Sequence, residues 1–298
     1  MNNLDSLTLE DLKKIFEQSK YVADENILLS VYLALKLKKP LLIEGEPGCG
    51  KTEIAKVLSQ GLNTELIRLQ CYEGLTASET IYEWDYMRQL IEIKIREGSK
   101  NPEELENYIF SEKFLLKRPL LKAVLYEGPL PPVLLIDEID RADEEFEGFL
   151  LEFLAEFQVT IPEIGTFKAK QEPIVVITSN RTRELGDGLR RRCLYLYIGY
   201  PSYEKELKIV RLKVPKLSEK VSEQIVRVVS RIREMDSILK KPGISETLDF
   251  SRAISETKID KLDSSTFQKF LGCLAKNPDD FSTLTKIDFS TLLSETMK

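Results

Sequence analysis

Eight consecutive residues near the amino terminus have the types and spacing needed to hold a phosphate group. They match the pattern GxxxxGK followed by Ser or Thr, and read Gly45-Glu46-Pro47-Gly48-Cys49-Gly50-Lys51-Thr52. Glycines let backbone N–H groups turn inward around phosphate oxygens, and the start of a following helix adds partial positive charge. Lys51 should reach the β and γ phosphates, and Thr52 should bind Mg²⁺. The segment predicts binding of ATP with Mg²⁺; the alternative is a glycine-rich turn with an ordinary surface lysine.

The surroundings of this phosphate loop favour the binding site. A strand-like run, Leu41–Glu44, precedes it, and a helical pattern, Glu53–Gln60, follows it. The motif requires this order of strand, loop and helix. The residues expected to contact the nucleotide are Gly45, Pro47, Gly48, Cys49, Gly50, Lys51, Thr52 and Glu53.

Two adjacent acids, Asp137 and Glu138, end the hydrophobic run Val133–Ile136. Buried strands seldom end in paired carboxylates without a reason, because burying charge is costly. Asp137 can hold Mg²⁺ through water, and Glu138 can orient and deprotonate the water that attacks the γ-phosphate. The chain has no histidine, so a carboxylate is the natural general base. The alternative is a strand followed by an acidic turn.

A third polar residue, Asn180, follows the apolar run Ile174–Thr178 and Ser179. It should lie at the same sheet edge as Asp137, where an amide can hold the attacking water near the γ-phosphate. The alternative is an asparagine that only forms a turn.

Three arginines stand together at Arg190, Arg191 and Arg192, directly before Cys193. Three like charges in a row repel one another, so placing them together does not favour a role in fold stability alone. They predict an arginine finger inserted into the site of a neighbouring subunit. The alternative is a solvated basic turn or a local acidic partner.

Several short apolar runs alternate with helical patterns between Val22 and Pro201, which predicts a parallel sheet flanked by helices in an α/β fold. The expected strands are Pro40–Glu44, Glu65–Gln70, Pro132–Ile136, Ile174–Thr178 and Leu194–Ile198. Helical patterns dominate from Ser202 onward, and Ser202 can cap the first of these helices. We therefore expect a nucleotide-binding α/β domain over 1–201 and a smaller helical domain over 202–298.

Composition limits the classes of function. The chain has 298 residues, 42% hydrophobic and 31% charged, which fits a globular protein. No apolar run approaches the roughly 18 residues that span a bilayer, and the polar start is unlike a signal peptide, so a cytoplasmic location without membrane contact is expected. The net charge of −6 argues against broad nucleic-acid binding. Four scattered cysteines without a CxxC pair argue against a zinc site.

These motifs together resemble the AAA+ ATPases, and within them the MoxR-type family. The matching segments are GEPGCGKT at 45–52, LLIDEIDRA at 134–142, ITSN at 177–180 and LRRRC at 189–193. The resemblance runs from about Tyr21 to Ile254 and implies a P-loop core with a carboxy-terminal helical lid. It also implies a homo-oligomeric ring, usually a hexamer. Residues 158–161 and 167–169 look like the hairpin that faces the pore of such rings; the alternative is a plain surface hairpin.

Further segments are similar to the CoxD-type ATPases, which are associated with maturation of molybdenum-containing CO dehydrogenases. These segments are LIRLQCYEGL at 66–75, YEWDYMRQL at 82–90, SNRTRELGDGLRRRCLY at 179–195 and GISETLDFSRAI at 243–254. The resemblance implies a partner with a von Willebrand factor A domain and a client metalloenzyme whose metal centre is assembled or remodelled.

The resemblance also assigns roles by position. Lys51 and Thr52 correspond to the Walker A pair, and the acids at 137 and 138 to the Walker B pair. Asn180 corresponds to sensor 1. Arg192 corresponds best to the finger, with Arg191 next. Arg252 resembles the sensor-2 arginine of the lid; the alternative is a helix-surface arginine.

The long charged segment 75–121 aligns poorly with the family. Its aromatic residues Tyr82, Trp84 and Tyr86 are either core residues of an extra helical layer or a surface for a client or partner. Three functions compete: a remodelling ATPase acting on a protein, a DNA-associated AAA+ motor, and a nucleotide-dependent switch with little hydrolysis. The acidic charge disfavours the motor, and the presence of both Glu138 and Arg192 disfavours the switch.

Overall fold

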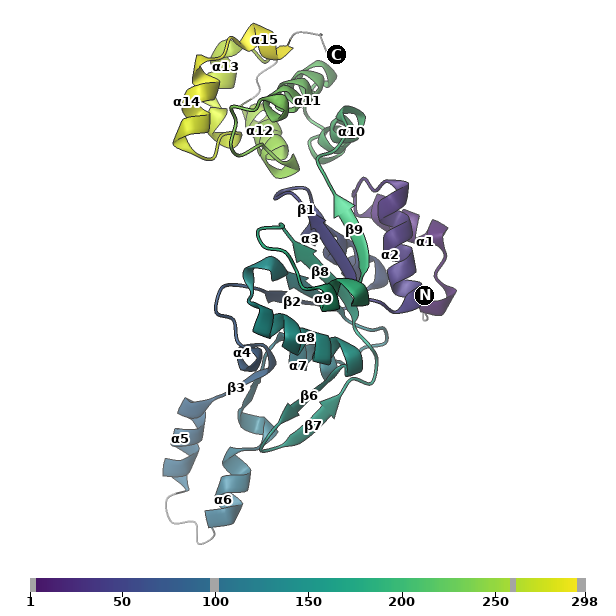
Figure 1. Cartoon of the computed structure of the whole chain (residues 1–298), viewed down its shortest axis with the longest axis vertical. Helices are drawn as coiled ribbons and strands as arrows, with labels where there is room; N and C mark the ends of the chain where they lie inside the picture. Colours follow the sequence, from purple (N-terminus) through teal and green to yellow (C-terminus); the bar gives the residue numbers. More distant parts are fainter. Residues whose placement is uncertain (1–3, 97–101, 258–260, 294–298) are drawn as a thin grey trace. The chain divides into compact units, whose positions relative to one another are not determined.

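The fold is described from a computed structural model that covers residues 4–96, 102–257 and 261–293. Its centre is a five-stranded sheet in the order β2-β5-β8-β1-β9 (Figure 1). The strands are β1 (Leu41–Gly45), β2 (Leu66–Gln70), β5 (Val133–Asp137), β8 (Ile174–Ser179) and β9 (Leu194–Ile198). The pairs β2–β5, β5–β8 and β8–β1 are parallel. The predicted parallel α/β core is confirmed.

The central strands β1 and β5 are buried along their whole length because helices cover the sheet. Every residue of β1 and of β5 is buried, as expected of parallel strands that are covered on both faces. The short helix α7 (Pro119–Val124) packs on β2 and β5. The other helices in this part of the chain are η1 (Leu4–Ser6), α1 (Leu9–Gln18), α2 (Glu25–Leu37), α3 (Lys51–Leu62), η3 (Ile139–Arg141), α8 (Glu144–Glu156) and α9 (Asp187–Arg192).

The segment between β2 and β5 contains an insertion built on a two-stranded ladder. Its elements are α4 (Ala77–Ile81), β3 (Tyr82–Trp84), α5 (Tyr86–Ile95), α6 (Pro102–Ile109), η2 (Glu112–Phe114) and β4 (Leu115–Lys117). Figure 1 shows α5 and α6 standing away from the five-stranded sheet. Trp84 is buried and packs edge-on against Tyr82 and Phe110, whereas Tyr86 is 63% exposed. The aromatic cluster is therefore divided between the core and the surface.

A β-hairpin forms at the predicted place. It consists of β6 (Gln158–Ile161) and β7 (Gly165–Lys168), which pair antiparallel and pack on α7. Val159 and Ile161 are buried, while Thr160 is exposed and shares a hydrogen bond with Thr166. The alternation gives the hairpin one core face and one open face. Its predicted position at a ring pore stays a prediction.

The chain divides into two compact units. The first comprises 1–15, 25–44 and 52–196, and the second comprises 16–24, 45–51 and 197–298. The second unit contains α10 (Tyr203–Lys213), α11 (Glu219–Glu234), α12 (Ile244–Glu256), α13 (Ser264–Lys269), η4 (Leu271–Cys273), α14 (Pro278–Lys286) and α15 (Phe289–Leu293). The predicted domains 1–201 and 202–298 stay a prediction.

The helical part of the second unit has its own apolar core and a buried ion pair. One face of α11 is buried through Val221, Ile225 and Ile232. Arg233 donates to both carboxylate oxygens of Glu206, at 2.5 and 2.7 Å. Breaking such a pair from one side is costly because the other charge stays buried.

Candidate functional site

The phosphate loop joins β1 to α3, and its backbone takes turns that suit glycine. Gly48 and Gly50 have φ angles of +74° and +87°, a region that side chains with a Cβ rarely occupy. Lys51 is 6% exposed, and its Nζ donates to the backbone oxygens of Gly45 at 2.7 Å and Glu46 at 2.8 Å. Burial raises the pKa of the Cys49 thiol to about 11, so this cysteine is a neutral lining residue and not a nucleophile.

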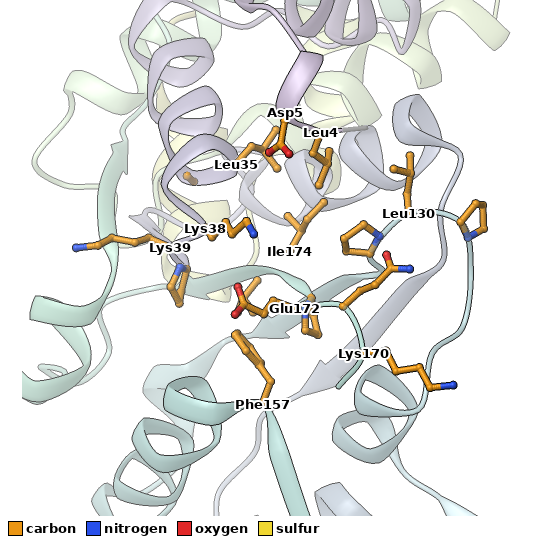
Figure 2. Close-up of a pocket in the computed structure, with 17 residues that line it drawn as sticks. Leu4, Asp5, Leu35, Lys38, Lys39, Leu130, Phe157, Lys170, Glu172 and Ile174 are labelled. Atoms are coloured by element: carbon orange, nitrogen blue, oxygen red, sulfur yellow. The ribbon is translucent and has the colours of Figure 1, made fainter. Parts of the chain in front are cut away.

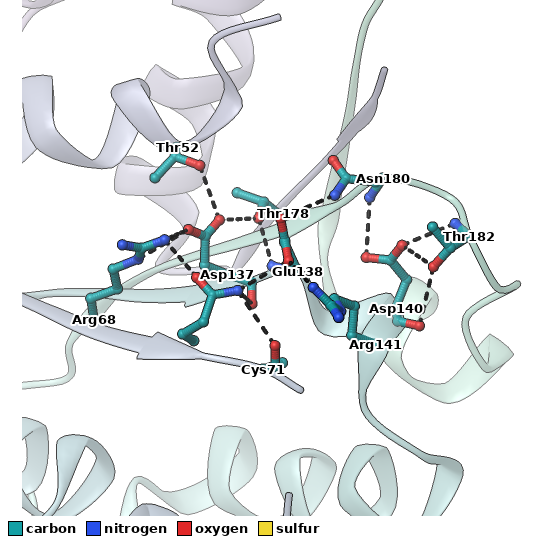
Figure 3. A network of polar contacts seen from close by, with 11 residues as sticks. Thr52, Arg68, Cys71, Asp137, Glu138, Asp140, Arg141, Thr178, Asn180 and Thr182 are labelled. Carbon is teal, nitrogen blue, oxygen red and sulfur yellow. Dashed lines mark hydrogen bonds and ion pairs between the residues drawn. The ribbon is translucent and has the colours of Figure 1, made fainter. Parts of the chain in front are cut away.

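Asp137 is the most heavily contacted acid of the site (Figure 3). It is 3% exposed. Its Oδ1 accepts from Thr52 Oγ1 at 3.0 Å and from Thr178 Oγ1 at 2.5 Å. Its Oδ2 accepts from Arg68 Nε at 3.0 Å and Nη2 at 2.6 Å. The structure therefore brings the predicted metal residues Thr52 and Asp137 together and adds two partners from other strands.

Glu138 is held by the residues on either side of it in the sheet. Its backbone has a φ of +57°, an uncommon conformation for a residue other than glycine. Its Oε1 accepts from Asn180 Nδ2 at 3.3 Å, and its Oε2 accepts from Gln70 Nε2 at 3.2 Å and from Arg141 Nη1 at 3.4 Å. The side chain remains 34% exposed, so water can reach it. Asn180 and Glu138 thus meet at one edge of the sheet, as their positions after neighbouring strands predict.

Asp140 ties the segment after β5 to the segment after β8. It is buried, and it accepts from the backbone N–H groups of Asn180 at 3.1 Å and Thr182 at 2.9 Å. It also accepts from Thr182 Oγ1 at 2.6 Å. Burial opposes ionisation, but the hydrogen bonds from Thr182 and Asn180 outweigh it and hold the pKa of Asp140 below its usual value. The carboxylate fixes the backbone that carries Asn180.

Glu44 links the last part of β1 to α9 and β9. It is 1% exposed, and it accepts from Arg190 Nη2 at 3.1 Å and from Tyr195 Oη at 3.0 Å. Burial, and then the hydrogen bond to Glu44, raise the pKa of Tyr195. Because Glu44 is a buried carboxylate, it needs cations nearby: Arg190 pairs with its Oε1 at 3.1 Å, and Arg181 lies 4.0 Å from its Oε2.

The other two arginines of α9 differ in their surroundings. Arg192 is exposed, and its Nη1 donates to the backbone oxygen of Leu151 on α8. Arg191 is also exposed, and within the described part of the chain it makes no ion pair or side-chain hydrogen bond. The assignment of the finger to Arg192, with Arg191 next, stays a prediction.

Arg252 lies on the surface of α12, more than half exposed, and pairs with Asp249 one turn earlier at 3.3 Å. The other end of α12 touches the phosphate loop, since Ser245 N donates to Gly48 O at 3.3 Å. Arg252 follows that contact by about two helical turns. The sensor-2 role of Arg252 and the helix-surface alternative both stay predictions.

The oxygen atoms around Thr52 and Asp137 suit Mg²⁺. Magnesium is a hard cation that proteins usually hold through one or two carboxylates together with substrate phosphates. Within the described residues no group of three or more histidines, cysteines and acids could hold a metal by itself. The donor set therefore fits a magnesium ion that arrives with a nucleotide. Among the same residues, no helix is long and apolar enough to cross a bilayer.

A separate cavity of about 430 Å³ opens at the opposite ends of the strands (Figure 2). Pro40 and Ile174, at the starts of β1 and β8, contribute to its wall. Its charged lining residues have both signs, namely Asp5, Lys38, Lys39, Lys170 and Glu172. None of the predicted site residues lines this cavity, so it lies outside the site.

Sequence reasoning missed five residues of this site: Glu44, Arg68, Gln70, Thr178 and Asp140. A weak signal existed for Arg68 and Gln70. In the strand Leu66–Gln70 the polar residues alternate with apolar ones and point to one face.

Comparisons with known proteins agree with this arrangement. Residues 40–193, just over half of the chain, match the family described as AAA domain (dynein-related subfamily). The gas vesicle ATPase GvpN1 of Halobacterium salinarum is 24% identical over 213 residues, covering 67% of this chain and 58% of that protein. The Holliday junction branch migration complex subunit RuvB of Fervidobacterium nodosum is 22% identical over 256 residues, covering 76% of this chain and 62% of that protein.

A solved structure of a RuvB variant from Thermotoga maritima has the same fold. It aligns with a TM-score of 0.50 at 18% identity, covering 94% of this chain and 75% of that chain. The chain spans less than two thirds of the length of the two relatives named above. The family match and the sheet with its phosphate loop and acidic pair lead to one conclusion: the chain belongs to the AAA domain family, dynein-related subfamily.

Proposed function

We propose that this protein hydrolyses ATP with Mg²⁺, with the phosphate loop as the nucleotide binder and with Asp137 and Glu138 as the residues that serve the metal and the attacking water. The observation that carries the proposal is the setting of Glu138. Asn180 and Gln70 hold its two oxygens, and its side chain is still open to water. A carboxylate in that position can accept a proton from a water molecule and direct it toward a phosphorus atom.

The other residues bind and orient the substrate. When a nucleotide binds, the ammonium group of Lys51 gives up its hydrogen bonds to two loop carbonyls and donates to phosphate oxygens instead. The backbone N–H groups of the loop add further donors. Thr52 and Asp137 would hold Mg²⁺, which neutralises phosphate charge when bound. Asn180 donates its amide to Glu138 and is close enough to share the attacking water.

The decisive experiment replaces Glu138 by glutamine. The variant keeps its shape and loses basicity, so we expect ATP to bind and turnover to fall by about two orders of magnitude or more. Phosphate release and binding of a fluorescent ATP analogue are both measured. Glu145→Gln, an exposed acid of α8, is the matched control and should retain the wild-type rate. Near-normal turnover of Glu138→Gln would mean that another group acts as the base.

We further propose a hexameric ring of identical subunits, because AAA+ proteins generally form ring oligomers. Arg192 or Arg191 of one subunit would then complete the site of its neighbour. The sensor-2 role of Arg252 is part of the same proposal. It requires Arg252 to leave its surface ion pair with Asp249.

The proposed task is remodelling of a client protein, in the manner that the MoxR resemblance implies. The CoxD-type segments favour a client metalloenzyme of the molybdenum type and a partner with a von Willebrand factor A domain. The exposed apolar side chains of α5, including Tyr86, Met87 and Ile95, offer a surface suited to a protein. Co-purification with Glu138→Gln, which should retain ATP and its client, tests this task.

The second candidate is a DNA motor, which the RuvB relative favours and the net charge of −6 disfavours. Fluorescence anisotropy with single-stranded and duplex DNA separates the two. Salt-sensitive binding in the micromolar range that stimulates ATP turnover would favour the motor. A nucleotide-dependent switch would bind ATP and show no turnover in the wild-type protein.

A further inference from the structure

Arg68 occupies one oxygen of the acid that is expected to serve Mg²⁺. Its guanidinium donates twice to Asp137 Oδ2, through Nε at 3.0 Å and Nη2 at 2.6 Å. The Arg68 side chain is 54% exposed, whereas the Asp137 side chain is 4% exposed. A buried carboxylate is thus neutralised by a cation that lies partly in solvent.

The two oxygens of Asp137 have different partners. Oδ1 accepts from the hydroxyls of Thr52 and Thr178, and Thr52 can keep donating its proton while its oxygen faces a metal. Oδ2 accepts from Arg68 in this structure. A second cation at Asp137 would therefore meet the guanidinium, and two like charges at one carboxylate repel each other.

Arg68 also has another acceptor close by. It lies on the edge strand β2, two residues before Gln70, so the two side chains share one face of the strand. Arg68 Nη2 donates to Gln70 Oε1 at 2.5 Å, and Gln70 Nε2 donates to Glu138. The guanidinium can leave Asp137 and keep a partner, and its movement would reach Glu138 through Gln70.

We propose that Arg68 is a positioning residue that neutralises Asp137 in the metal-free protein and releases Oδ2 when Mg²⁺ and nucleotide enter. The inference rests on the proposed ATP site. It predicts competition, in which Arg68 raises the Mg²⁺ concentration that nucleotide binding requires. A residue that only held Asp137 in place would act in the opposite direction, and its loss would weaken binding at every Mg²⁺ concentration.

The test compares wild type, Arg68→Gln, Arg68→Lys and Arg118→Gln in the full chain. Arg118 is the matched control because it is an exposed arginine, 48% accessible, whose acidic partner is Glu83 of β3. Affinity for fluorescent ADP is measured while Mg²⁺ is titrated, and thermal unfolding is followed in EDTA and in Mg²⁺ with ADP.

Arg68→Gln should need about three- to tenfold less Mg²⁺ for half-maximal ADP affinity, the scale of one charge-assisted contact at a half-exposed position. Arg68→Lys keeps the charge without the double contact, so its Mg²⁺ requirement should fall by less than that of Arg68→Gln. Arg118→Gln should match wild type. Arg68→Gln should also unfold at a lower temperature than wild type in EDTA, because Asp137 loses its cation, and the difference should shrink with Mg²⁺ and ADP.

An unchanged or raised Mg²⁺ requirement in Arg68→Gln, with wild type binding normally, would overturn the role of Arg68 alone. Wild-type protein that binds no nucleotide would overturn the proposed function and this inference together. If Arg68→Gln does not fold, Arg68→Lys decides: a lowered Mg²⁺ requirement supports the competition, and a curve that superimposes on wild type refutes it.

Discussion

At the scale of single residues, the ammonium group of Lys51 is buried against the backbone oxygens of Gly45 and Glu46. These carbonyls hold the charge inside the loop, where a phosphate oxygen would replace them as a stronger, ionic acceptor. The desolvation of Lys51 is therefore complete before a nucleotide arrives, which reduces the cost of binding.

Replacing Lys51 by alanine should weaken ATP binding by about 10- to 100-fold, the scale of one or two charge-assisted hydrogen bonds. Isothermal titration calorimetry measures the change. Lys56→Ala is the matched control, since Lys56 lies on the same helix and pairs with Glu53 at the surface. Equal ATP affinities in the wild type and in Lys51→Ala would show that this loop does not bind the nucleotide.

At the scale of elements, Asp140 joins η3, which follows β5, to the segment that follows β8. Its three hydrogen bonds hold Asn180 and Thr182 in register with the acidic pair. The two strands are neighbours in the sheet, and Asp140 adds to the contacts that Thr178 and Asn180 already make with the acidic pair. Asp140 therefore maintains the distance between Asn180 and Glu138.

Asp140→Asn should lower the free energy of unfolding by about 1–3 kcal/mol at neutral pH, because a charged acceptor of backbone N–H groups is lost. The pKa of Asp140 is lower in the folded protein, so its contribution is present above the unfolded pKa. It should fade as the pH drops below about 4, toward the folded pKa. Urea denaturation at several pH values measures this.

The control for that series is Asp187→Asn, an exposed acid at the start of α9. Its effect on stability should be small at every pH. A gap between Asp140→Asn and wild type that stayed constant down to pH 3 would show that the ionised form of Asp140 is not what stabilises the fold.

At the scale of the whole molecule, the proposed ring requires an arginine of α9 to act between subunits. Arg190 is the partner of buried Glu44, and Arg192 donates to a carbonyl of its own chain. Arg192 can still leave that exposed contact, because water replaces the carbonyl as an acceptor for its guanidinium N–H groups.

Subunits carrying Arg192→Ala, mixed with subunits carrying Lys51→Ala, should recover ATP turnover that neither variant shows alone. Some interfaces of the mixed ring then pair an intact Lys51 with an intact neighbouring Arg192. A finger is worth about 10³–10⁵ in rate, so the recovery should be easily measured. Co-assembly without recovery would count against Arg192, and the same mixture made with Arg191→Ala would then test Arg191.

The sequence by itself determined the local chemistry of this protein. The phosphate loop, the acidic pair and the residue after β8 are each set by a few consecutive residues next to a strand, so spacing alone predicts them. The five strands were also predictable, because each is a short, mainly apolar run bounded by polar or turn-forming residues. The hairpin was expected at 158–161 and 167–169 from the family resemblance, and its second strand instead runs over Gly165–Lys168.

Only the tertiary structure decided which distant side chains meet. Arg68 and Gln70 reach Asp137 and Glu138 because β2 lies beside β5 with Gln70 opposite Asp137, and no local pattern gives strand order or register. The separation of Trp84 from Tyr86 depended likewise on which side chains the insertion could bury. Contacts between residues far apart in sequence arise from the packing of the whole sheet, which single-segment periodicity does not contain.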